Sequence, residues 1–117
     1  MNIILHITQR EQWKQAKLVQ AYRGDTLDTE GFIHCSTPLQ VIKVANNFFP
    51  GQQGLLLLCI DSDKVQAEIR YEGLEELFPH IYGPLNIDAV FKVLDFEPDE
   101  DGLFKMPPEI TDLTQAG

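Results

Sequence analysis

Basic residues are scarce in this chain. Its 117 residues include nine lysines and arginines against eighteen aspartates and glutamates, which gives a formal net charge of −9. Phosphate contacts dominate nucleic-acid affinity, so a general nucleic-acid binder needs a stripe of basic residues. The sequence has no such stripe, and we expect no general nucleic-acid binding. One small anion can still be held by local donors, because net charge acts mainly through long-range steering.

Long hydrophobic runs are also absent. The longest, residues 55–60, has the length of a strand, whereas a membrane span needs about 20 apolar residues. Residues 1–6 show neither the basic region nor the cleavage site of a signal peptide. We therefore expect a cytoplasmic protein without a membrane partner.

Cysteine is limited to Cys35 and Cys59, which both fall within apolar segments. In a cytoplasmic chain this placement favours free, buried thiols. No CxxC pair, zinc-finger spacing or glycine-rich nucleotide motif occurs. The three histidines lack the HxxxH and HxH spacings that favour a metal, so we expect no metal site.

The composition, 44% hydrophobic and 23% charged, is that of one ordinary globular domain. We predict an α+β fold with mixed β-sheets and two principal helices, in a single domain over residues 1–108 with a frayed tail over residues 109–117. The apolar patterns predict strands over residues 2–8, 31–35, 54–60, 67–72 and 89–96. Residues 54–60 are almost continuously apolar, which indicates a central strand buried on both faces.

Hydroxyl residues mark the expected helix starts. The Thr8-x-x-Glu11 spacing is that of a capping box, and predicts a helix to about Val19. The triplet at residues 36–38, Ser-Thr-Pro, predicts the start of a second helix that ends before Pro50. We expect three phenylalanines to be core residues: Phe48, Phe49 and Phe91.

The three histidines occur in similar settings. Side chains alternate between the two faces of a strand, so Ile3, Leu5 and Ile7 should face the core from the first strand. The opposite faces then present a histidine followed two residues later by a hydroxyl: His6 and Thr8, His34 and Ser36, and His80 and Tyr82. If these strands are neighbours, the pairs line one cleft. The alternative is that the histidines are half-buried structural residues and that Thr8 and Ser36 only cap helices.

An anion could also be bound near these histidines. The two predicted helix N-termini would supply free N–H groups and a positive dipole end. Arg23, Lys43 and Arg70 are cations that could join them, although Arg70 shares a strand face with Glu72 and the pair could equally form a solvated edge. Alternation turns Cys35 toward the core and away from His34, so we do not expect a nucleophilic thiol.

Three segments resemble a known family. They are residues 4–8 (ILHIT), residues 30–37 (EGFIHCST) with Gln40, and residues 78–85 (FPHIYGPL). They resemble a group of small, mostly bacterial proteins catalogued as domain of unknown function 952, over roughly residues 2–107. More distantly, the chain looks like a compact member of the ADP-ribosyltransferase fold, which grips NAD in a cleft between two small sheets.

The resemblance implies roles for individual residues. His6 and Thr8 match the element that holds the ribose and nicotinamide, and His34 and Ser36 match the strand that flanks the nicotinamide. The third element of that fold usually bears a glutamate, and the matching residues 80–82 have none. In this respect the chain is more similar to the RNA 2′-phosphotransferases of the same fold, which rely on histidine and arginine.

The expected function is therefore that of a histidine-lined cleft for NAD or an ADP-ribosyl nucleotide. The enzyme would be transferase-like, with glycosyl or phosphoryl transfer both open, or glycohydrolase-like; NAD is the candidate substrate and no cofactor is assigned. The expected catalytic residues are His34 and His80, and the expected substrate-binding residues are His6, Thr8, Ser36, Tyr82, Arg23 and Arg70. The alternative is a non-catalytic module that binds a small ligand or a protein.

Overall fold

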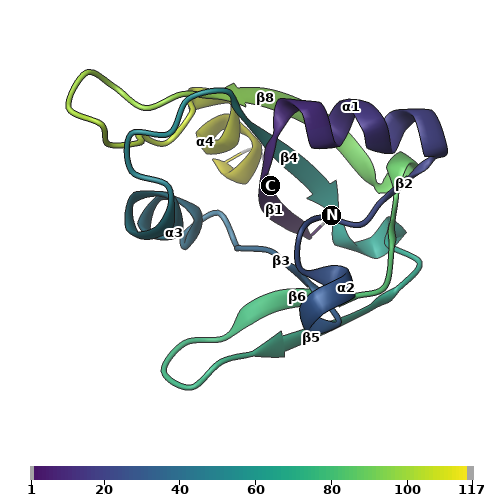
Figure 1. Ribbon diagram of the computed structural model, residues 1–117. Helices are drawn as coiled ribbons and strands as arrows, with labels where there is room; N and C mark the ends of the chain where they lie inside the picture. The colour runs from purple at the N-terminus through teal and green to yellow at the C-terminus, as the bar shows by residue number, and fades with distance from the viewer. Residues whose placement is uncertain (1, 116–117) are drawn as a thin grey trace.

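A computed structural model describes residues 2–115, which form three small sheets and four α-helices (Figure 1). The strands are β1 (Ile3–Gln9), β2 (Ala21–Tyr22), β3 (Ile33–His34), β4 (Leu55–Asp61), β5 (Glu68–Glu72), β6 (Phe78–Tyr82), β7 (Leu85–Asn86) and β8 (Val90–Phe96). The helices are α1 (Arg10–Val19), α2 (Leu27–Glu30), α3 (Val41–Phe48) and α4 (Pro108–Gln115), with 3-10 turns η1 (Ser62–Lys64) and η2 (Ile87–Ala89). The α+β prediction is confirmed, with two more helices than expected.

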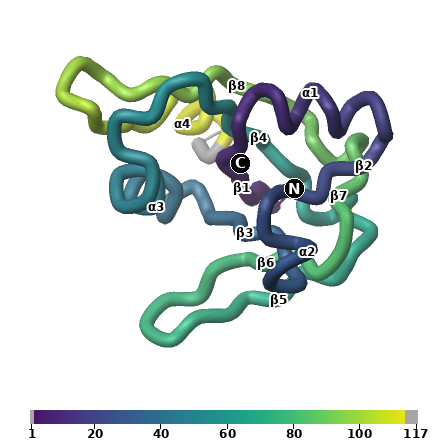
Figure 2. Tube along the Cα trace, in the orientation of Figure 1, coloured from purple at the N-terminus to yellow at the C-terminus, as the bar shows by residue number. Residues whose placement is uncertain are grey.

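All strand pairs are antiparallel. One sheet has the order β1-β4-β8, a second has the order β3-β6-β5, and β2 pairs with β7 alone. Figure 1 shows the β3-β6-β5 sheet apart from the β1-β4-β8 sheet, with α1 and α3 on different sides of β1. The Cα trace in Figure 2 shows β2 and β7 running together beyond the end of α1.

Strand β4 lies at the centre of its sheet, and all seven of its residues are buried. Leu56, Leu58 and Ile60 pack into one hydrophobic cluster with Trp13 of α1. The alternate residues of β4, together with residues of α3 and α4, form a second cluster on the other face. The prediction of a central strand buried on both faces is confirmed, because helices cover both sides of the sheet.

Strand β1 is an edge strand whose two faces are both covered. Leu5 lies in the cluster with α3 and α4, as alternation predicts, but Ile4 on the opposite face is 1% exposed and lies in the other cluster. The face that carries His6 and Thr8 is therefore an interior surface. The prediction of one core face and one less buried face is wrong, because contacts with distant parts of the chain decide whether one or both faces of a strand are covered.

The two larger sheets meet at one backbone bridge. Leu5 and Ser36 form an isolated antiparallel pair, with the Leu5 amide donating to the Ser36 carbonyl oxygen at 2.7 Å and the Ser36 amide donating back at 2.8 Å. The segment that follows His34 thus runs beside β1, and brings the first two histidine strands together.

The two hydroxyl helix caps expected from the sequence do not form. Helix α1 begins at Arg10 with Gln9 as the N-cap and no side-chain cap. Ser36 is engaged in the bridge to β1, and α3 begins only at Val41 after a turn in which the Thr37 amide donates to the Gln40 side-chain oxygen at 3.0 Å. Both hydroxyls are therefore free of the capping role and belong to the site described below.

The C-terminal segment is folded where the sequence suggested a frayed tail. Pro108–Gln115 form helix α4, and Ile110 is 1% exposed in the cluster with α3. The expectation for residues 116–117 lies outside the described residues. Phe49 is partly buried, but Phe48 is 74% exposed and Phe91 is exposed as well, so the core assignment is wrong for these two.

None of the helices formed by residues 2–115 is long and apolar enough to cross a membrane.

Candidate functional site

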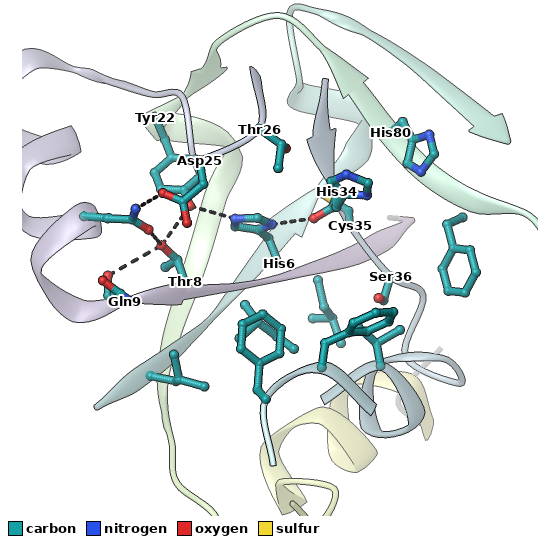
Figure 3. A pocket seen from close by; sticks show the side chains of 18 of the residues that line it. His6, Thr8, Gln9, Tyr22, Asp25, Thr26, His34, Cys35, Ser36 and His80 are labelled. Atoms are coloured by element: carbon teal, nitrogen blue, oxygen red, sulfur yellow. Dashed lines mark hydrogen bonds between the residues drawn. The ribbon is translucent and has the colours of Figure 1, made fainter. Parts of the chain in front are cut away.

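A cavity of about 540 Å³ lies beside the edge strand β1, between the two larger sheets (Figure 3). Its volume is within the range of pockets that bind small molecules. Apolar and aromatic residues from β1, α3 and the start of β6 form part of the wall, among them Val44, Phe48, Phe49 and Phe78. The polar residues of the wall come from segments far apart in the chain: His6, Thr8, Gln9, Gln12, Tyr22, Asp25, Thr26, His34, Ser36, Glu72 and His80.

The ring of His6 is fixed through both nitrogens. Its Nδ1 lies 2.5 Å from the backbone carbonyl oxygen of His34, and its Nε2 lies 2.7 Å from the hydroxyl of Tyr22. A carbonyl oxygen only accepts, so Nδ1 carries a hydrogen. Burial lowers the pKa of His6 to about 4 despite the bond to His34. His6 is therefore neutral at pH 7, and its Nε2 accepts from Tyr22.

Tyr22 joins His6 to Thr8. Its hydroxyl lies 2.7 Å from each of the two, and it has only one hydrogen to give. With that hydrogen on the bond to His6, the hydroxyl of Thr8 donates to Tyr22. Burial raises the pKa of Tyr22 well above its usual range, so the phenol stays protonated.

The chain of polar groups continues to Gln12 and Asp25. The side-chain oxygen of Gln12 lies 3.0 Å from Oγ1 of Thr8, and the side-chain nitrogen of Gln12 donates to the carboxylate of Asp25. Thr8 has one hydrogen to give, and the oxygens of Tyr22 and Gln12 both lie within reach of it. This end of the cavity therefore has more acceptors than donors.

His34 and His80 face each other across strands β3 and β6. They are directly opposite in register, and their ring centroids lie 5.2 Å apart. Phe32 stacks on His80 with a centroid distance of 4.2 Å. Nε2 of His34 lies 3.3 Å from the carboxylate of Glu30, and about half of both side chains is exposed.

Glu72 holds His80 in one orientation. Its Oε1 accepts from Nδ1 of His80 at 3.0 Å and from the hydroxyl of Tyr82 at 2.5 Å. These bonds, that from Tyr82 first, lower the pKa of Glu72 below its usual range, so it is ionised at neutral pH. Nδ1 of His80 carries the hydrogen, and Nε2 has no partner among residues 2–115. This nitrogen is the accessible acceptor of the ring.

The two cysteines are free and buried, as expected. Cys35 lines the cavity, but burial raises the pKa of its thiol far above the usual range. Burial likewise raises the pKa of Cys59 to about 11. A thiol that stays protonated is a poor nucleophile, so this geometry does not favour thiolate chemistry.

The structure brings together five of the residues singled out from the sequence, and leaves three apart. The five that line the cavity are His6, Thr8, His34, Ser36 and His80. Tyr82 reaches the cavity only through Glu72. Arg23 pairs with Asp28 at 2.5 Å, and Arg70 pairs with Glu68 and lies over the ring of Tyr82. Both arginines lie outside the cavity wall.

The residues that sequence reasoning missed are Gln12, Tyr22, Asp25, Thr26 and Glu72. Tyr22 lies in a two-residue strand within a polar segment, where no periodic pattern points to it. For Glu72 the sequence predicts only that it shares a strand face with Arg70, either near the anion or at a solvated edge. The register of the β5–β6 hairpin places Arg70 opposite His80 and Glu72 two residues further along, and only this hairpin pairing could have revealed the contact. No group of three His, Cys, Asp or Glu side chains within residues 2–115 could hold a metal ion.

These features define a small α+β domain with a histidine-lined cavity between two antiparallel sheets. The sequence profile of the family described as "Protein of unknown function (DUF952)" matches residues 7–93, which is well over half of the chain. The protein belongs to this family.

The fold is also that of a solved relative. The crystal structure of protein CC0527 from Caulobacter crescentus is 29% identical, with a TM-score of 0.84 over 93% of this chain and 98% of that chain. The solution NMR structure of CC0527 gives 30% identity and a TM-score of 0.79 over 93% of this chain and 97% of that one. No curated protein matches the chain. These comparisons lend no support to the likeness with ADP-ribosyltransferases.

Proposed function

We propose that the cavity binds NAD or a related ADP-ribosyl nucleotide by its nicotinamide and the adjoining ribose. The observation that carries the proposal is the convergence of His6, His34 and His80, from three strands of two sheets, on one cavity of about 540 Å³. Cavities of this size with apolar walls and a few convergent polar groups are the usual sites of small-molecule ligands.

His80 is the strongest candidate for proton exchange with the ligand. Glu72 fixes the hydrogen on Nδ1, which leaves Nε2 to accept a hydrogen from a ligand hydroxyl. In this proposal His34 orients the ligand from the facing strand. Both nitrogens of His6 are already bonded, so His6 is a positioning residue that holds Tyr22 and the backbone of His34.

The proposed ligand lies only partly in the cavity. Among residues 2–115, no lysine or arginine lines the wall, and both arginines suggested from the sequence are engaged in surface ion pairs. The proposal therefore places the diphosphate at the solvent side, and the nicotinamide and ribose inside. The apolar wall then packs against the ring, and Ser36, which lines the cavity, offers its hydroxyl to the ribose or the carboxamide.

The reaction class that fits this arrangement is cleavage of the bond between nicotinamide and ribose. The C1′–N bond breaks, its electron pair leaves with neutral nicotinamide, and positive charge develops on the ribose. An acceptor hydroxyl or water then forms the new C1′–O bond and gives its hydrogen to Nε2 of His80. The carboxylate of Glu72 stabilises the charge that accumulates on the histidine ring.

Calorimetric titration with NAD tests the proposal. We expect saturable binding by the wild type, a loss of roughly tenfold or more in affinity for His34→Ala, and no such loss for Arg70→Ala, the matched control on the same sheet but outside the cavity wall. His34 is half exposed, so the variant should remain folded. Equal binding by both variants, or none by the wild type, would contradict the proposal.

A binding module without turnover is the second candidate. The specific observation in its favour is that His6 has both ring nitrogens engaged by the protein itself. Measurement of nicotinamide release from NAD separates the two functions: release that is lost in His80→Asn supports the enzyme, and binding without release supports the module.

A further inference from the structure

The charged groups of the cavity wall are of one sign. Asp25 lies at the end of the cavity near Thr8, and Glu72 lies at the end near His80. Within the part of the chain that the structure describes, no lysine or arginine lines the cavity to balance them. The site therefore has two carboxylates without a lysine or arginine in the described wall, and the wall residue that pairs with Glu72 is His80.

The uncharged polar groups of the wall also favour a cation over an anion. His6 is uncharged, because burial lowers its pKa to about 4. The oxygen of Gln12, which competes with Tyr22 for the one hydrogen of Thr8, adds an acceptor beside Asp25. The first amide of α1, on Arg10, could attract an anion here, but it donates to the carbonyl oxygen of Gly54 at 3.2 Å.

Aromatic side chains form part of the same cavity wall. Tyr22, Phe48, Phe49 and Phe78 all line the cavity. The faces of such rings attract cations, and aromatic walls with nearby carboxylates are a recurring way to bind flat or quaternary nitrogen cations. The net charge of −9 also attracts cations toward the molecule as a whole.

We infer that the cavity selects a flat organic cation over its uncharged counterpart, with Asp25 and Glu72 as the specificity-determining residues. This inference rests on the proposed function, in which the ring that enters the cavity is the positively charged pyridinium of NAD⁺. The reduced ring of NADH, which has the same diphosphate and riboses but no charge on the ring, is the disfavoured form.

Two matched pairs of probes test the inference by NMR titration at neutral pH and low ionic strength. The first pair is 1-methylnicotinamide, a cation, and nicotinamide, which is neutral. The second pair is NAD⁺ and NADH. We expect the cation of each pair to bind roughly tenfold more tightly, as charge-assisted contacts do, and the preference to fall at high salt.

The variants assign the preference to the two carboxylates. Asp25→Asn and Glu72→Gln should each reduce the preference for the cation, and the double variant should abolish it. Glu68→Gln is the matched control, because Glu68 lies on the same strand as Glu72 and pairs with Arg70 outside the cavity wall. If Glu72→Gln unfolds the protein, Asp25→Asn alone still carries the test, since Asp25 is exposed.

The four probes separate this inference from the proposed function. Equal affinity for NAD⁺ and NADH would overturn the inference while the nucleotide site stands. Selective binding of 1-methylnicotinamide without binding of NAD⁺ would support the inference and contradict the nucleotide proposal. Failure of all four probes to bind would overturn both.

Discussion

The hydroxyl of Tyr22 lies 2.7 Å from Nε2 of His6, in the wall between the hydrophobic core and the cavity. Tyr22 itself is 2% exposed, and its ring lies edge-on to the imidazole at a centroid distance of 5.1 Å. The same hydroxyl is bonded to Thr8, so one buried side chain fixes two residues of the candidate site. The geometry of the cavity therefore depends on a core residue from a different sheet.

Tyr22→Phe tests this dependence. The substitution keeps the ring but removes the hydroxyl from His6 and Thr8, and leaving a buried polar partner unpaired costs about 1–3 kcal/mol. We expect a loss of that size in the free energy of unfolding, measured by urea denaturation. Tyr71→Phe, at an exposed tyrosine, is the control and should be nearly neutral. Equal effects of the two changes would mean that the bonds of Tyr22 contribute nothing to stability.

His6 should make stability depend on pH. Its pKa is about 4 in the folded protein against 6.5 for the free side chain, so the unfolded chain binds more protons between these values. The contribution is complete above pH 6.5 and is lost as the pH falls toward 4, by roughly 3 kcal/mol in all. We would compare the unfolding free energies of the wild type and His6→Asn at pH 7 and pH 4.5. The difference between the two proteins isolates the contribution of His6 from that of the carboxylates. A parallel pH dependence in the two proteins would refute the assignment.

Cys35 and Cys59 should resist alkylation in the folded protein. Both thiols are buried, and burial raises the pKa of each, so little thiolate is present even at pH 8. Mass spectrometry after iodoacetamide treatment should show no adduct in buffer and two adducts in denaturant. Rapid modification of Cys35 without denaturant would show that the cavity holds a reactive thiol after all.

Helix α4 should contribute to the core. Ile110 is 1% exposed and packs in the cluster with Phe96 and Phe104, so Ile110→Ala should cost about 2–5 kcal/mol in unfolding free energy. Leu103→Ala, at an exposed leucine nearby in sequence, serves as the comparison and should cost much less. A negligible effect at Ile110 would support the frayed tail expected from the sequence.

The sequence predicts those elements whose surroundings follow from the local pattern of apolar residues. The continuous apolar run at residues 55–60 can only be stable between two covered faces, and β4 is the central strand that this requires. Side-chain alternation alone also predicts that His6 shares a strand face with Thr8, and that His34 shares one with Ser36. These residues share one cavity because the Leu5–Ser36 bridge joins their strands.

The rest of the site depends on contacts between distant segments. The sequence predicts that Thr8 caps α1. Its hydroxyl instead bonds to Tyr22 and Gln12, and these side chains compete with the backbone amides of the helix for the Thr8 oxygen. Glu72 comes to His80 through the register of a hairpin, and Tyr22 through a strand of only two residues. No single stretch of sequence contains such information.

The most direct test of the ligand site is a titration of the ¹⁵N-labelled protein with NAD⁺, followed through its backbone amides. The account predicts saturable shifts at residues 6–8, 34–37 and 80–82, with the amides of α4 unchanged as the internal reference. Flat spectra at millimolar NAD⁺, or shifts confined to segments outside the cavity wall, would contradict it.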